Sequence, residues 1–146
     1  MSSVYSLIQL TLECLYDKNK LLSIQDKKDC IETWYGILIL YMVRFSQARI
    51  YNISCKSGVN RGGKSNSILF KLLCILMDKE NTASYARIHR VITHAPALLA
   101  EQQTIALNRR ERLFSALALL QNEAVQKRLK SLAPILGIVS KSTIKV

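Results

Sequence analysis

The stretch that decides the fold runs from Ala48 to Met77 and reads ARIYNISCKSGVNRGGKSNSILFKLLCILM. Its first seven residues, 48–54, carry β-branched and aromatic side chains at period two, which predicts a half-buried strand. A polar, glycine-rich loop follows, and the apolar run from Ile68 to Met77 predicts a helix. A loop in this position directs its backbone N–H groups and the positive end of the helix toward one point, which suits a phosphate.

The loop satisfies two phosphate-binding motifs at once. Residues Gly58 to Ser65 match the nucleotide-binding pattern G-x-x-x-x-G-K-[ST], in which Lys64 reaches the β- and γ-phosphates and Ser65 holds Mg²⁺. Residues Cys55 to Arg61 match the C-x5-R loop of cysteine-dependent phosphatases. In that loop Cys55 attacks phosphorus and Arg61 binds two phosphoryl oxygens with its planar guanidinium group.

The surrounding sequence favours the phosphatase motif. Nucleotide hydrolysis needs a separate strand that ends in a metal-binding aspartate. The only apolar run with that ending, from Leu72 to Asp78, follows Ser65 too closely to lie outside the same helix. The chain also lacks the further strand patterns of a doubly wound sheet, so nucleotide binding is kept only as the alternative.

Cys55 has the sequence surroundings of a reactive thiol. A thiolate is the nucleophilic form of cysteine, and the start of a helix together with Lys56 and Arg61 favours that form. The remaining cysteines lie inside apolar helical patterns and are expected to be small core residues; they are Cys14, Cys30 and Cys74. Their wide spacing indicates neither a zinc site nor a disulfide framework.

The letters Cys55-Lys56-Ser57-Gly58, followed by Arg61 and Gly63, resemble the signature C-K-S-G-K-D-R-T-G. That signature belongs to the bacterial inositol phosphate phosphatases of the SopB type, effectors that are secreted into host cells. The resemblance covers about residues 31–77. It implies that Cys55 is the nucleophile, Arg61 the phosphate clamp, and Lys56 a basic contact for a multiply phosphorylated ring.

Three positions depart from that signature. Val59 replaces a lysine that would contact further phosphates, and Asn60 replaces an aspartate that is a candidate general acid. Gly62 replaces the threonine or serine that assists breakdown of the phosphoenzyme. The departures affect turnover more than binding, so a truncated or degenerate relative that binds anionic lipid heads without turnover is a second interpretation.

The predicted site has two catalytic residues, Cys55 and Arg61, and a larger set that contacts the substrate. The substrate-binding set is Lys56, Ser57, Gly58, Val59, Asn60, Gly62, Gly63 and Lys64. No metal ion or other cofactor is expected. Asp26 and Asp29 lie upstream, where many cysteine phosphatases carry a mobile acid, but their place at a helix start favours capping. His89 and His94 are five residues apart, the wrong spacing for two metal ligands on one helical face, and are expected to be partly exposed.

Composition predicts one globular domain, 1–146, because 49% of the 146 residues are apolar and only 21% are charged. The net charge of +11 indicates an anionic partner. No acidic residue lies between Glu32 and Asp78, where six basic residues occur: Arg44, Arg49, Lys56, Arg61, Lys64 and Lys71. This charge favours a polyanionic ligand, and inositol phosphates, anionic lipid heads and nucleic acid would all satisfy it. The resemblance to the SopB type implies a phosphoinositide or an inositol polyphosphate as the substrate, with an anionic membrane surface as a further partner and no nucleic acid.

The fold class is predicted to be mainly α, around one strand–phosphate loop–helix unit at 48–78, as a minimal or partial α/β cysteine-phosphatase core. Helices are expected over 3–16 and 25–45, the second capped by Ser23 and Asp26 and buried at its centre. A C-terminal helical part is expected over 82–132. It would break before Pro96, run on to Leu120 with Leu99 and Phe114 buried, and resume over 123–132.

Neither a signal peptide nor a membrane-spanning run is recognised in the sequence, and the longest apolar run, 34–43, is too short to cross a bilayer. The sequence itself predicts a cytoplasmic protein, and delivery into a host cell follows only from the resemblance. Besides the enzyme and the non-catalytic phosphate binder, a third class stays open: a basic helical protein that binds nucleic acid or membrane through diffuse charge.

Overall fold

The computed structural model describes residues 4–16, 20–48, 50–51, 60–79, 83–102 and 104–138. This part of the chain contains six α-helices and no strand, so the prediction of a mainly helical protein is confirmed. The helices are α1 (Val4–Leu15), α2 (Ile24–Ser46), α3 (Asn60–Leu76), α4 (Ala83–Glu101), α5 (Leu107–Leu119) and α6 (Glu123–Lys130). None of the described helices is both long enough and apolar enough to cross a membrane.

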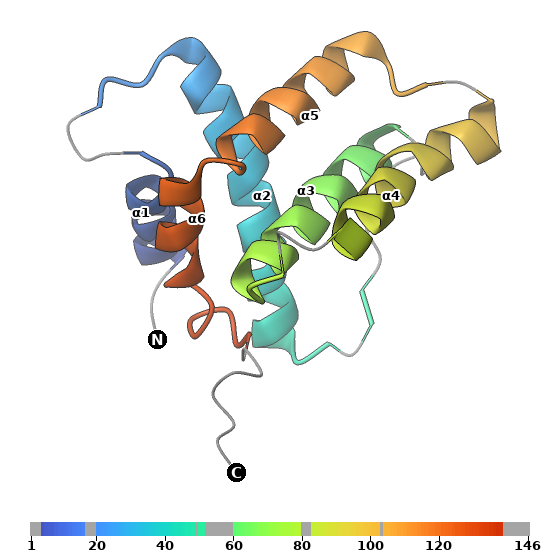
Figure 1. Cartoon of the computed structure of the whole chain (residues 1–146). Coiled ribbons are helices and arrows are strands. Elements are labelled where there is room, and N and C mark those ends of the chain that lie inside the picture. Colours follow the sequence, from blue (N-terminus) through green and yellow to red (C-terminus); the bar gives the residue numbers. More distant parts are fainter. Residues whose placement is uncertain are drawn as a thin grey trace.

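Helix α3 lies at the centre of the molecule and packs against α2, α4, α5 and α6 (Figure 1). Its large aliphatic residues recur at helical spacing, and neighbouring helices bury most of them almost completely. The buried set is Ile68, Leu69, Leu72, Ile75 and Leu76. Each large aliphatic side chain removed from water in this way contributes about 1.5–3 kcal/mol, so α3 supplies much of the core.

Helices α1 and α6 pair on one flank of the fold, although they come from opposite ends of the chain (Figure 1). The pair is joined by reciprocal hydrogen bonds at the end of α1. The Arg128 Nε donates to the Cys14 carbonyl oxygen at 2.8 Å, and the Cys14 Sγ lies 3.4 Å from the Arg128 carbonyl oxygen. Arg128 thereby satisfies one of the carbonyl groups that every helix leaves open at its C-terminus.

The predicted cap of the second helix is confirmed. The Asp26 backbone N–H donates to Ser23 Oγ at 3.1 Å, and the Ser23 N–H donates to Asp26 Oδ2 at 2.9 Å, which together form a capping box. Hydrogen bonds from the Ser23 side chain and from Lys20 lower the pKa of Asp26 to about 2. The sequence therefore determines where α2 begins.

The predicted burial of the second helix is confirmed only for part of its surface. Ile37 and Leu40 are buried, but Tyr35 and Met42 are about 60% exposed. Helix α2 thus presents one face to α3 and α5 and another to solvent.

The predicted strand is not observed in the described part of 48–54. Ile50 and Tyr51 belong to no regular element, and Ile50 is 90% exposed. Arg49 and the residues 52–59 lie outside the described part of the chain. The helix that follows begins at Asn60 rather than at Ile68, so the predicted loop over 62–67 is wrong.

The predicted break at Pro96 is also wrong, because α4 continues through this proline to Glu101. Thr93 and Ala97, on either side of Pro96, are 4% and 1% exposed, so packing of this part of α4 offsets part of the cost of a proline inside a helix. The chain breaks instead after α4, at Gln102, which has a φ of 50°. Because α4 and α5 are separate helices, Leu99 and Phe114 do not share the single apolar stripe that was predicted, and both are exposed rather than buried.

Helices α2 and α3 approach closely at Gly36. A Cβ atom at this position would lie 2.6 Å from Leu72 Cδ1 and 3.5 Å from Ile68 Cγ2. We expect Gly36→Val to lower the free energy of unfolding by about 2 kcal/mol, because the added side chain would displace the fully buried Leu72. Urea denaturation followed by circular dichroism measures this change. The control is Ala118→Val at an exposed position of α5; an equal loss there, or none at Gly36, would contradict the close approach.

Candidate functional site

The predicted phosphate site falls at the N-terminus of α3. Cys55, Lys56, Ser57, Gly58 and Val59 lie outside the described residues, and so do the side chains of Asn60 and Arg61. The backbone of Asn60 and Arg61 forms the first turn of α3, a helix of 17 residues with no acidic residue in that turn.

The first four N–H groups of a helix have no partner within the helix, and the helix dipole adds partial positive charge at the same end. This positive end of α3 therefore follows directly after the segment that contains Cys55.

Gly62 and Gly63 are helical and buried, which differs from the predicted loop. A Cβ atom at Gly63 would lie 3.4 Å from the Thr93 carbonyl oxygen of α4. Helix α4 therefore lies against the start of α3 at a distance that a methyl group at Gly63 would just fill. Both glycines are thus part of the packed interior besides any contact between their backbone and a phosphate.

Lys64 makes an ion pair that the sequence did not indicate. Its Nζ lies 2.5 Å from Glu32 Oε1, and the two side chains are only 13% and 16% exposed. The ammonium group is therefore already neutralised by α2, and the geometry does not favour the predicted contact between Lys64 and a phosphate. The positive charge of the stretch between Glu32 and Asp78 is therefore partly neutralised, because Glu32 pairs with Lys64.

This arrangement does not meet two structural requirements of the nucleotide-binding alternative. Its motif needs a loop up to the lysine, but the chain is helical from Asn60 onward. It also needs a lysine that reaches the phosphates, whereas Lys64 is bound to Glu32. Ser65, the expected Mg²⁺ ligand, lines a pocket of about 250 Å³ between α2 and α3.

This pocket between α2 and α3 lies beside the first turns of α3 and combines polar with apolar walls. Its lining residues are Glu32, Tyr35, Gly36, Ile39, Lys64, Ser65 and Ile68. The pocket thus offers a partly polar space next to the start of α3.

The upstream aspartates have structural partners. Asp26 caps α2, as predicted. Asp29 is 7% exposed and accepts hydrogen bonds from Ser115 Oγ at 2.8 Å and from Gln25 Nε2 at 2.9 Å. It joins α2 to α5 rather than capping a helix. Both carboxylates lie within α2 and are engaged by these partners, unlike the mobile acid of many cysteine phosphatases.

Sequence reasoning missed a hydrogen-bonded group formed by Ser67, His89 and Thr93 between α3 and α4. Ser67 Oγ lies 2.8 Å from His89 Nε2, and Thr93 Oγ1 donates to Ser67 Oγ at 2.8 Å. Ser67 is fully buried, so a substrate cannot reach it as it would reach a catalytic serine. The group instead fixes the imidazole ring. The available signal was the spacing of four residues between His89 and Thr93, which places both on one face of α4.

Burial lowers the pKa of His89 below its ordinary value. The positive charges of Lys71 and His94 lower it further, whereas the hydrogen bond to the Ser67 carbonyl raises it. The imidazole is consequently neutral at pH 7. A neutral ring held in place can line a binding site without adding a third positive charge to Lys71 and Arg90 nearby.

The sequence matches no model of a protein family and no curated protein, and the fold matches no solved structure. The chemistry of the site therefore has to be inferred from its residues.

The Lys64–Glu32 ion pair can be tested by a double-mutant cycle. We expect Lys64→Met or Glu32→Met alone to lower the free energy of unfolding by about 2 kcal/mol, because each leaves a largely buried charge without its partner. The double variant should lose less than the sum of the two. The exposed Lys20–Asp26 pair is the control, and Lys20→Met should have a much smaller effect. Additive losses in guanidinium denaturation would contradict a direct pairing.

The histidine predicts a pH dependence of stability. Since the pKa of His89 is lower in the folded state than its ordinary 6.5, the unfolded chain takes up the proton first as the pH falls. The contribution of His89 to stability is complete above about pH 7 and is lost as the pH falls below about 6.5 toward the folded pKa. We expect His89→Gln to flatten this slope in urea denaturation. His94→Gln is the control and should keep it, because His89 remains buried; equal slopes in wild type and His89→Gln would contradict the assignment.

Proposed function

We propose that this protein is a cysteine-dependent phosphatase of phosphoinositides or inositol polyphosphates. Cys55 is the nucleophile and Arg61 the phosphate clamp, in the C-x5-R segment that leads into α3. One observation carries the proposal: α3 begins at Asn60, so the positive end of a long helix coincides with the end of the C-x5-R motif.

The reaction would proceed in two steps. The Cys55 thiolate attacks phosphorus, a sulfur–phosphorus bond forms, and the ester bond to the leaving alcohol breaks. Arg61 and the backbone amides at the start of α3 stabilise the charge on the phosphoryl oxygens. Water then attacks phosphorus, which releases inorganic phosphate and restores the thiolate. The leaving oxygen needs a proton that Asn60 cannot supply, because an amide is not an acid at neutral pH.

A second candidate is binding of the same anions without turnover. Two features favour it: Asn60 in place of an acid, and Gly62 in place of a hydroxyl side chain. Gly62 is buried inside α3, so no neighbouring hydroxyl group stands at that position to assist hydrolysis of a phosphoenzyme. Anion binding depends on Arg61 and the helix end, which these departures leave unchanged.

The test is phosphate release from a panel of phosphoinositides and inositol polyphosphates. We expect wild type to release phosphate and Cys55→Ser to lose at least about a hundredfold in rate, because the alcohol is a far weaker nucleophile than the thiolate. Cys30→Ser, at a half-buried position in α2, is the matched control and should remain active. Equal rates in wild type and Cys55→Ser would contradict the enzyme.

A binding measurement separates the candidates. Cosedimentation with vesicles containing phosphatidylinositol bisphosphate should weaken about tenfold in Arg61→Ala, through loss of a charge-assisted contact. Arg112→Ala, at an exposed position of α5, should bind like wild type. Binding without any phosphate release would support the second candidate. Equal loss in both arginine variants, with a steep dependence on salt, would contradict a defined site and indicate diffuse charge.

A further inference from the structure

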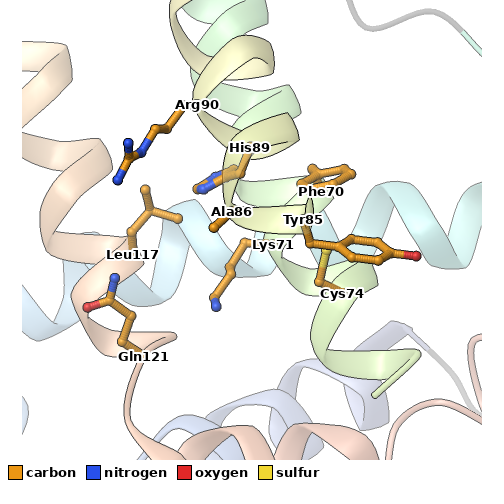
Figure 2. A pocket seen from close by; sticks show the side chains of 9 residues that line it. All are labelled: Phe70, Lys71, Cys74, Tyr85, Ala86, His89, Arg90, Leu117 and Gln121. Carbon is orange, nitrogen blue, oxygen red and sulfur yellow. The ribbon is translucent and has the colours of Figure 1, made fainter. Parts of the chain in front are cut away.

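A second pocket, of about 300 Å³, lies between α3, α4 and the end of α5 (Figure 2). It is separate from the start of α3, because its first lining residue, Phe70, is nine positions beyond Arg61. At 1.5 Å per residue this corresponds to roughly 13 Å along the helix. Its volume is at the lower end of the range for pockets that bind small molecules.

The charged side chains that line this pocket are all positive. Lys71 of α3 and Arg90 of α4 line it, and none of its lining residues is acidic. Neither cation belongs to an ion pair within the described part of the chain, in contrast to Lys20, Lys64 and Lys130. Two uncompensated cations that line one pocket repel each other, and a bound anion would remove that cost.

Aromatic rings form the wall between the two helices. The ring of Phe70 stacks on Tyr85, with centroids 6.0 Å apart and planes at 25°, and on His89, at 6.0 Å and 15°. Hydrogen bonds to Ser67 hold the imidazole of His89 in this position. Leu117 of α5 lines the same pocket, so a bound molecule would contact apolar surface from both sides.

Figure 2 shows how the polar groups are placed. Lys71 and Arg90 extend from different helices toward the part of the pocket that Leu117 and Gln121 line on the α5 side. Gln121 adds an amide that can donate a hydrogen bond to an oxygen atom. The polar groups thus gather at the α5 side, and the rings lie beside them. This division suits a ligand with a charged head and a flat apolar body.

We propose that this pocket binds a small organic oxyanion, a phosphate, phosphonate or carboxylate carried on a flat or apolar body. Lys71 and Arg90 bind the oxyanion, Gln121 hydrogen-bonds to it, and the rings with Leu117 contact the body. The proposal does not depend on the phosphatase, because it uses no residue of the C-x5-R motif.

The test is a titration of the whole chain with phenylphosphonate, which has no ester bond to hydrolyse, followed by ¹⁵N–¹H NMR. We expect saturable shifts of the amides of Ala86, Leu117 and Gln121. Benzamide has the ring without the charge, and inorganic phosphate has the charge without the ring; each should bind at least about tenfold more weakly than phenylphosphonate. Benzoate distinguishes carboxylate from phosphonate recognition, and binding of either acid supports the proposal. Benzamide binding as tight as that of the acids would overturn it.

Substitutions of the basic lining residues test whether phenylphosphonate binds in this pocket. Lys71→Gln and Arg90→Gln should each weaken binding of phenylphosphonate about tenfold. Arg90 is exposed, so its substitution leaves the core intact, and Arg87→Gln on the same helix is the matched control that should bind like wild type. Arg61→Ala should also bind like wild type at this pocket, which separates it from the proposed phosphatase site. Equal weakening in Arg87→Gln and Arg90→Gln, or shifts confined to the start of α3, would overturn the proposal.

Discussion

The burial of α3 is the constraint on which the other features depend. Four helices pack around it, and its two ends meet different neighbours. At its start, Lys64 pairs with Glu32 of α2 and Gly63 lies against the backbone of α4. In its second half, Phe70 and Lys71 form part of a pocket with α4 and α5. A helix held on several sides cannot turn about its axis, so the residues that it presents to each neighbour are fixed. Both pockets are consequences of that fixed orientation.

The local features of the fold could be predicted from the sequence. The apolar stripes of α1 and α2 gave two helices with nearly correct ends, and the Ser23–Asp26 pair gave the start of α2, because caps and periodicity act over a few residues. The same reasoning placed the start of α3 too late. Two consecutive glycines favour a loop by intrinsic propensity, but both are buried within α3, where tertiary packing overrides that propensity. Pro96 was misread for a similar reason, since it lies between the buried residues Thr93 and Ala97 of a continuous α4.

The candidate site also combines local features that the sequence reveals with contacts between distant residues that it does not reveal. The order of cysteine, arginine and helix could be recognised in the sequence, because it is a local motif. The partner of Lys64 could not, since Glu32 lies 32 residues away and only the packing of α2 on α3 brings the two together. The Ser67–His89 contact spans 22 residues between two helices and has no local signature. Counting charges along the sequence overstated the positive charge near the predicted loop for the same reason, because Glu32, which neutralises Lys64, comes from another helix.

The pairing of α1 with α6 has a consequence for biosynthesis. The Arg128–Cys14 contact joins positions 114 residues apart, so the first helix leaves the ribosome long before the last one is made. Until then, the buried stripe of α1, which includes Leu7 and Leu15, lacks the neighbour that covers it in the finished protein. Helix α2, which follows directly in the chain, covers only part of α1, so the remaining apolar surface of α1 stays exposed until α6 has been made.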